Sequence, residues 1–124
     1  MNGKSHFTVF VALALLVNAC ATNVVADKRA RFDVATGVFD AGDYPRAYQI
    51  WSELADEDDL AAMRNAAQML RQGKGVAKDA AVARRWYARA SDGGNSRAMY
   101  NLALMQVRGD GGERRGGPPG AAGS

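Results

Sequence analysis

The chain has very few of the residues that enzymes use for acid–base and nucleophilic chemistry. Its 124 residues include one histidine, His6, and one cysteine, Cys20, and both lie in the first 20 positions. The absence of histidine and cysteine from the rest of the chain excludes a serine–histidine–aspartate triad, a cysteine–histidine pair and a histidine-ligated zinc site there. A disulfide framework is excluded too, because one cysteine has no partner within the chain. We expect no catalytic, cofactor-binding or metal-binding residues.

A long apolar segment is also absent, and so is a strong charge of one sign. The longest apolar run, residues 7–17, falls well short of the 18 or more residues of a membrane-spanning helix. The 16 basic and 13 acidic residues give a net charge of +3, which is too weak to indicate a nucleic acid partner. Hydrophobic residues make up 48% of the sequence, and this globular composition favours a single domain.

The N-terminal segment has the pattern of a secretory signal peptide, which we predict over residues 1–19. A short polar stretch that includes Lys4 precedes the apolar run, and small residues follow it. A buried core helix is the alternative, but the run lacks the capping residue and the polar spacing of such a helix.

Residues 17–20, Val-Asn-Ala-Cys, resemble a bacterial lipobox, in which cleavage occurs before a cysteine that becomes lipidated. The resemblance implies acylation, such as by palmitate, at Cys20 and a lipid anchor in the cell envelope. In a Gram-negative host, Ala21 after the cysteine implies an outer membrane lipoprotein that faces the periplasm. Ordinary signal cleavage after Ala21 or Ala26 is the alternative. We assign residues 20–27 to the lipidated cysteine and a tether. More than one acyl chain on the cysteine makes such an attachment stable.

The body of the sequence repeats with a period of 36 residues. The segments 62–75 and 98–111 agree at seven of 14 positions without a gap. The same shift aligns Trp51 with Tyr87. Periods of about 20–50 residues indicate stacked supersecondary units.

Each unit has the pattern of two helices. Apolar residues recur at spacings of three, four and seven, which place them on one helical face. The predicted helices cover residues 29–41, 44–56, 60–72, 80–91 and 96–108, and no strand is expected. Aspartate and asparagine favour helix N-caps, and the predicted caps are Asp43, Asp59, Asp79 and either Asn95 or Ser96.

The second half of the chain resembles the Sel-one-like repeat family, a relative of the tetratricopeptide repeats. The residues that carry this resemblance are the Gly-Lys-Gly-Val loop at 73–76, Asp79, Ala83, Trp86-Tyr87, Ala90, Gly94-Asn95, Ala98, Tyr100-Asn101-Leu102 and Met105. The likeness is close over residues 60–111 and looser over residues 32–59. It implies an all-α fold, a short right-handed α-solenoid of antiparallel helix pairs with about two and a half repeats over residues 28–108.

The C-terminal segment departs from the family pattern. Residues 109–124 contain seven glycines and two prolines, which predict a disordered tail instead of a second helix. An apolar face on the last helix, with Leu102, Leu104, Met105 and Val107, would then be exposed. Self-association, a tail that folds back and a truncated gene all remain open.

Two asparagines, Asn65 and Asn101, lie one repeat apart on the first helices of their units. In tetratricopeptide relatives such asparagines hold peptide backbones or carboxylates, and in this family they equally brace the repeat interface. The resemblance thus implies a protein or peptide partner. The candidate partner-binding residues are Asn65, Asn101, Arg64, Gln68, Arg71 and Tyr100.

Charge is distributed unevenly along the chain. Residues 27–59 carry a net charge of −5, and residues 60–115 carry +7. A solvated helical surface accounts for this asymmetry, and so does an anionic partner such as a lipid or an acidic protein. We expect a lipid-anchored envelope scaffold that is not an enzyme. The alternatives are an envelope hydrolase, a penicillin-binding protein and a truncated relic without function.

Overall fold

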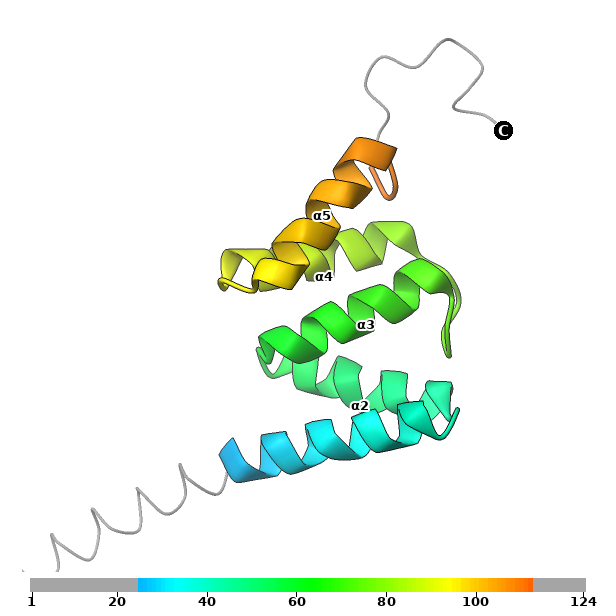
Figure 1. Cartoon of the computed structure of the whole chain (residues 1–124), viewed down its shortest axis with the longest axis vertical. Coiled ribbons are helices and arrows are strands. Elements are labelled where there is room, and N and C mark those ends of the chain that lie inside the picture. The colour runs from blue at the N-terminus through cyan, green and yellow to red at the C-terminus, as the bar shows by residue number, and fades with distance from the viewer. Residues whose placement is uncertain (1–24, 113–124) are drawn as a thin grey trace, which may run out of the picture.

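The computed structural model describes residues 25–112, and within that range it consists of five helices without a strand (Figure 1). The first of them, which we call the N-terminal helix, covers residues 25–40. The others are α2 (Tyr44–Asp56), α3 (Leu60–Gln72), α4 (Ala80–Asp92) and α5 (Ser96–Arg108). The predicted signal peptide, Cys20 and residues 113–124 lie outside the described residues.

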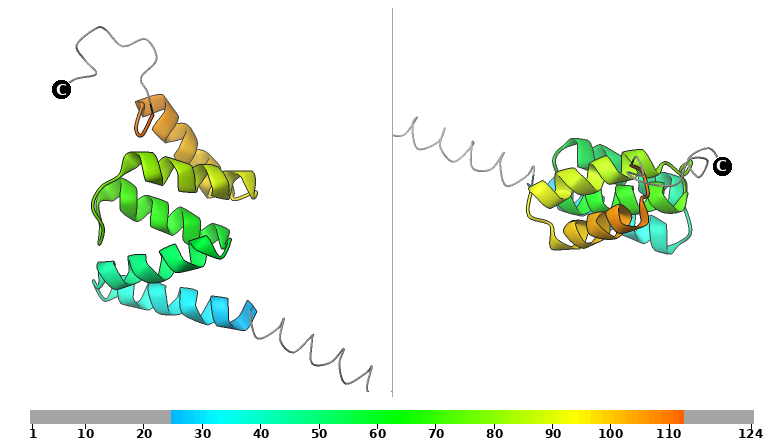
Figure 2. Two further views of the ribbon diagram at one scale, coloured as in Figure 1. Left: turned by 180° about the vertical axis from the view of Figure 1, so that it is seen from behind. Right: turned by 90° about the horizontal axis from the view of Figure 1, so that it is seen from above.

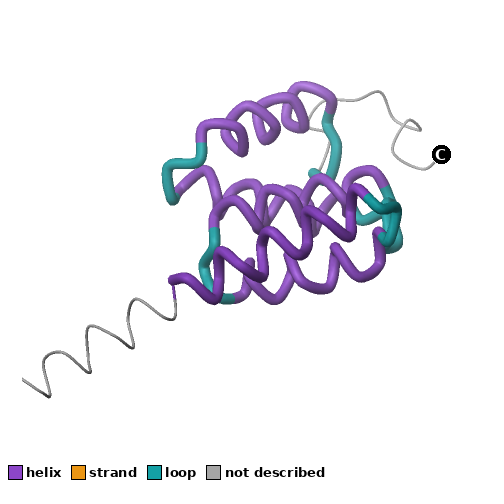
Figure 3. Tube along the Cα trace, turned by 60° about the horizontal axis from the view of Figure 1, so that its bottom comes forward, coloured by secondary structure: helices purple, strands orange, loops and turns teal. Residues whose placement is uncertain are grey.

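The helices stack one after another, and successive helices run in alternating directions (Figures 1 and 2). α3 packs against both α2 and α4, and α5 packs against α4. The N-terminal helix and α5 lie at opposite ends of the stack (Figure 1). The loops lie at the two ends of the helices, as the tube in Figure 3 shows. This arrangement confirms the predicted all-α fold and short helical solenoid.

The predicted caps begin the helices as expected. Side-chain oxygens of Asp43, Asp59, Asp79 and Asn95 accept hydrogen bonds from the N–H three residues further on, at 3.4, 2.8, 3.0 and 2.9 Å. Asn95, and not Ser96, is therefore the cap of α5. Because each cap pairs an amide that the helix leaves unpaired, these four positions set the starts of α2 to α5.

The prediction for the first helix was wrong by four residues at its start. Residues 25–28 are already helical, so the helix includes the last three residues of the segment 20–27 that we assigned to the tether. Asp27 pairs with Arg31 one turn further on at 3.6 Å, and the Lys28 ammonium donates to the Glu57 carbonyl at 2.9 Å. The second contact ties this turn to the end of α2 and stabilises it.

The 36-residue period also appears in the packing of the loops. Gly75 and Gly111 both have a positive φ, of 73° and 69°. A Cβ at Gly75 would lie 2.8 Å from the Pro45 nitrogen, and one at Gly111 would lie 3.0 Å from the Ala81 nitrogen. Pro45 and Ala81 are themselves 36 residues apart, so the loop after α3 closes on the first turn of α2 in the same way as the loop after α5 closes on the first turn of α4.

The core runs along the stack between the helices. Small alanines allow close approach of the helices, and the largest fully buried side chains are Tyr87, Leu54, Met63, Met69 and Met105. Met105 is 1% exposed and Leu102 packs against the core. The expectation that these two residues of α5 are exposed was therefore wrong. Val107 is 86% exposed, as expected. Within residues 25–112, every helix is too short or too polar to span a bilayer.

Candidate partner-binding groove

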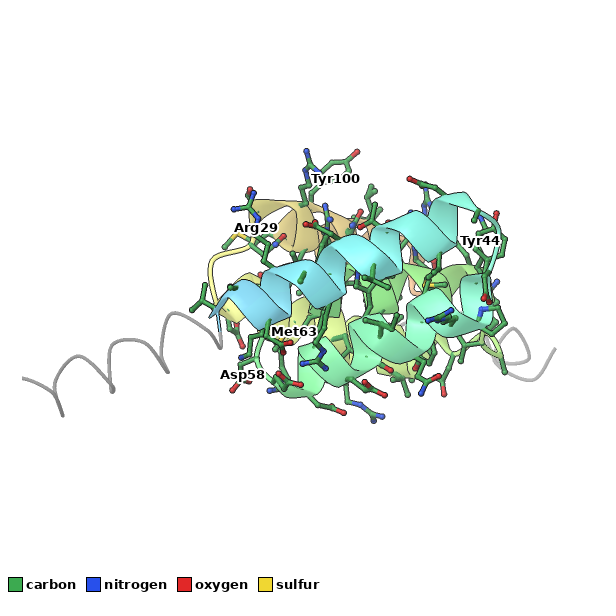
Figure 4. All side chains as sticks on the ribbon, turned by 90° about the horizontal axis from the view of Figure 1, so that it is seen from below. Arg29, Tyr44, Asp58, Met63 and Tyr100 are labelled. Carbon is green, nitrogen blue, oxygen red and sulfur yellow. The ribbon has the colours of Figure 1, made fainter. Side chains whose placement is uncertain are left out.

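An open groove of about 400 Å³ lies between α3 and α5, which are equivalent helices of successive repeats. We call it the α3–α5 groove. Its lining residues are Arg64, Gln68, Ser96, Arg97, Tyr100 and Asn101. Figure 4, which looks along the stack, shows Tyr100 and Arg29 projecting from one side of the molecule and Asp58 from the opposite side.

The helical period explains why these side chains come together. Arg64 and Gln68 are four residues apart on α3, and Arg97, Tyr100 and Asn101 are three and four apart on α5. Residues at these spacings share one face of a helix. Since α4 packs against both α3 and α5, it holds the two polar faces beside each other.

Arg64 is the most constrained charge in the groove. One of its terminal nitrogens, Nη2, donates to the Asn65 Oδ1 at 2.8 Å, while its Nε is buried without a hydrogen-bond partner. Burial lowers the pKa of the Arg64 guanidinium, and the positive charge of Arg97 lowers it further. The groove therefore concentrates positive charge, and none of its lining residues is acidic.

Asn65 does not line the α3–α5 groove. It lies in a smaller cavity of about 130 Å³ that is bordered by Phe39, Trp51, Gln68, Met69 and Gln72. Its side-chain oxygen is occupied by Arg64, so that Asn65 holds the guanidinium in place from behind. Gln68 borders both cavities.

Arg71 is also outside the α3–α5 groove. Its Nε is buried without a hydrogen-bond partner, and its guanidinium lies close to the Tyr87 hydroxyl. Burial raises the pKa of Tyr87, and the nearby Arg71 and Arg64 partly oppose that rise. Arg71 therefore lies at the interface of α3 and α4, away from the residues that line the α3–α5 groove.

The structure thus brings together four of the six predicted residues: Arg64, Gln68, Tyr100 and Asn101. Ser96 and Arg97 complete the groove and were missed. The spacing of Arg97 from Asn101, four residues on one helix, was the signal that could have identified it. The groove offers hydrogen-bond donors, positive charge and one exposed aromatic ring, which suit the binding of a peptide. Among residues 25–112, histidine, cysteine and acidic side chains form no cluster of three that could hold a metal ion.

Comparison with known proteins identifies the fold. No family model and no curated protein matches the chain. Among solved structures, the chain is similar to a Sel1 repeat protein from Oxalobacter formigenes, with a TM-score of 0.61 and 25% sequence identity over 67% of this chain. The match covers 33% of that protein, so the chain spans about a third of its length. The helices over residues 25–112 therefore form a Sel1-like repeat fold, as the motifs of residues 60–111 predict.

Proposed function

We propose that this protein is a lipid-anchored scaffold of the cell envelope that binds a protein or peptide segment in the α3–α5 groove. The observation that carries the binding role is the groove itself, in which equivalent helices of two repeats present polar side chains to one open space. The anchor rests on the lipobox resemblance of residues 17–20. Its volume of about 400 Å³ lies in the range of sites that bind ligands. The Sel1-like repeat fold supports a binding role, since stacked repeats form extended binding surfaces.

The groove is tested by selection of peptides. A displayed peptide library is panned on the chain from Ala21 onward, and the enriched peptides are titrated against variants. Gln68→Ala combined with Asn101→Ala should lower their affinity about tenfold or more, because two side chains that can hydrogen-bond a peptide backbone are removed. Gln49→Ala, an exposed change on α2 outside the groove, is the matched control and should bind unchanged.

Two results would contradict the groove as the binding site. In the first, the enriched peptides bind the double variant as tightly as the unchanged chain. In the second, Gln49→Ala weakens binding as much as the double variant does. Helical circular dichroism of each variant checks that the fold is intact.

The anchor is tested by its acceptor residue. Cys20→Ser should abolish labelling by radioactive palmitate, because the thiol is the acceptor for the lipid. Thr22→Ala, which keeps the thiol, should be labelled and should fractionate with the membrane like the unchanged chain. Palmitate labelling that survives the loss of Cys20 would rule out this anchor.

A further inference from the structure

Two arginines from neighbouring repeats line the α3–α5 groove without an acidic partner. Arg64 comes from α3 and Arg97 from α5. Within residues 25–112, neither of them forms an ion pair, although acidic side chains pair with other arginines of the chain. Arg31 contacts Glu57 and Arg89 contacts Asp58, each at 2.8 Å. Within the described residues, Arg64 and Arg97 thus keep their positive charge without an ion pair, and the groove that they line is positive.

The half-buried position of Arg64 makes this arrangement unfavourable in the absence of a counter-charge. Its Nε is shielded from solvent and has no hydrogen-bond partner, and a buried donor without a partner is unfavourable. Asn65 accepts from one terminal nitrogen and fixes the orientation of the guanidinium. A carboxylate in the groove would offset the repulsion between Arg64 and Arg97 and would gain charge-assisted hydrogen bonds.

The start of α5 adds to the same field. Arg97 lies in the first turn of this helix, which contains no acidic residue. The positive end of the helix dipole favours an anion near this turn. Gln68, Asn101 and Tyr100 supply amide and hydroxyl groups beside the arginines, and these groups can pair with a peptide backbone.

We propose that the α3–α5 groove binds an acidic peptide segment, with a side-chain carboxylate held between the Arg64 and Arg97 guanidinium groups. This inference rests on the proposed function, since it names the chemistry of the bound segment. A segment with several carboxylates is favoured over a single terminal carboxylate, because the part of the chain that contains α3 and α5 is basic overall. Residues 60–112 contain nine basic and three acidic residues.

The test uses end-blocked peptides and the chain from Ala21 onward. A peptide of alternating glutamate and serine, acetylated and amidated, is compared with the same peptide in which glutamine replaces glutamate. Only the acidic peptide should bind. Arg64→Gln and Arg97→Gln should each weaken it roughly tenfold, the effect of one lost charge-assisted hydrogen bond. Arg85→Gln, which removes the same charge from an exposed site on α4, should weaken it less than twofold.

Arg97→Gln is the decisive variant, because Arg97 is exposed and its loss leaves the core untouched. Equal losses for Arg85→Gln and Arg97→Gln would show diffuse attraction and overturn the proposal. Binding of a neutral peptide through a free C-terminus, or of anionic phospholipid vesicles in place of the acidic peptide, would also overturn it. Library peptides that lack acidic residues but depend on Gln68 and Asn101 would overturn this inference and leave the proposed function standing.

Discussion

Gly75 and Gly37 show how much the cost of a side chain depends on local backbone geometry. Gly75 has a φ of 73°, in the left-handed region, and a Cβ there would lie 2.8 Å from the Pro45 nitrogen. Gly37 lies within the N-terminal helix, and a Cβ there would meet nothing within 4 Å. The same substitution should therefore change stability in opposite directions at the two positions.

Gly37→Ala should raise the free energy of unfolding by about 0.5–1 kcal/mol, because alanine restricts the unfolded chain and favours the helix. Gly75→Ala should lower it by at least about 1–2 kcal/mol, through the left-handed conformation and the clash with the first turn of α2. Urea unfolding followed by circular dichroism measures both. If Gly75→Ala is neutral, the close contact between this loop and α2 is not needed for stability.

A buried phenol makes the stability depend on alkaline pH. Burial raises the pKa of Tyr87 above the value of about 10 that it has in the unfolded chain. Below about pH 10 the hydroxyl is protonated in both states, and its contribution to stability is fully present. As the pH rises toward the folded pKa, the unfolded state loses its proton first, so that the folded state becomes less stable.

We predict that the melting temperature falls above about pH 10 and that Tyr87→Phe reduces this fall. Tyr100→Phe serves as the control, because Tyr100 is 66% exposed. Thermal melts across the alkaline range measure the effect. Identical pH profiles for the unchanged chain and Tyr87→Phe would show that another group is responsible. Tyr48, whose pKa burial also raises, is the first candidate for such a group.

At the scale of elements, the sequence predicted the helices well because their signals are local. The caps Asp59, Asp79 and Asn95 lie at the starts of their helices, and the bounds of α2, α3 and α5 agree with the prediction. The start of the N-terminal helix was predicted four residues too late. Its first turn is stabilised by the contact of Lys28 with the Glu57 carbonyl, 29 residues further along the chain. No local pattern contains a contact of that separation.

The groove was predictable to a similar extent. The repeat period placed Arg64, Gln68, Tyr100 and Asn101 on equivalent helices, and the structure brings them together. The separation of Asn65 from Asn101 into two cavities depends on how each repeat is offset from the next. That offset is set by packing between helices, and a repeat period does not specify it.

The helices of the stack should differ in local stability. α3 buries six residues between α2 and α4, whereas α5 buries two, Ala98 and Met105, and packs mainly against α4. Opening α5 therefore exposes less apolar surface than opening α3. Backbone amides of α5 should exchange with deuterium at least tenfold faster than those of α3, as measured by mass spectrometry of the full chain. Equal protection of the two helices would indicate that the stack opens only as a whole.

For the molecule as a whole, the repeat allows the exposure of equivalent residues in successive repeats to be compared. Met63 in α3 is 2% exposed, while Met99, its equivalent one repeat later in α5, is 46% exposed. The loop after α5 nevertheless packs as the loop after α3 does, since Gly111 contacts the first turn of α4 in the manner of Gly75 and α2. The stack over residues 25–112 thus presents at α5 a surface that it covers at α3.

A further helix added in the register of the repeat should therefore stabilise the molecule. In this variant a copy of residues 76–92 replaces residues 112–124, which places the copied helix 36 residues after α4. Covering Met99 and Val107 should each contribute up to about 1.5–3 kcal/mol, less the cost of ordering the added segment, and the melting temperature should rise by several degrees. Two serines inserted before the copied segment turn the apolar face of the new helix by about 200° and should remove the gain. If the shifted copy stabilises the chain equally, the gain comes from added helix alone, and the 36-residue period does not govern how layers pack.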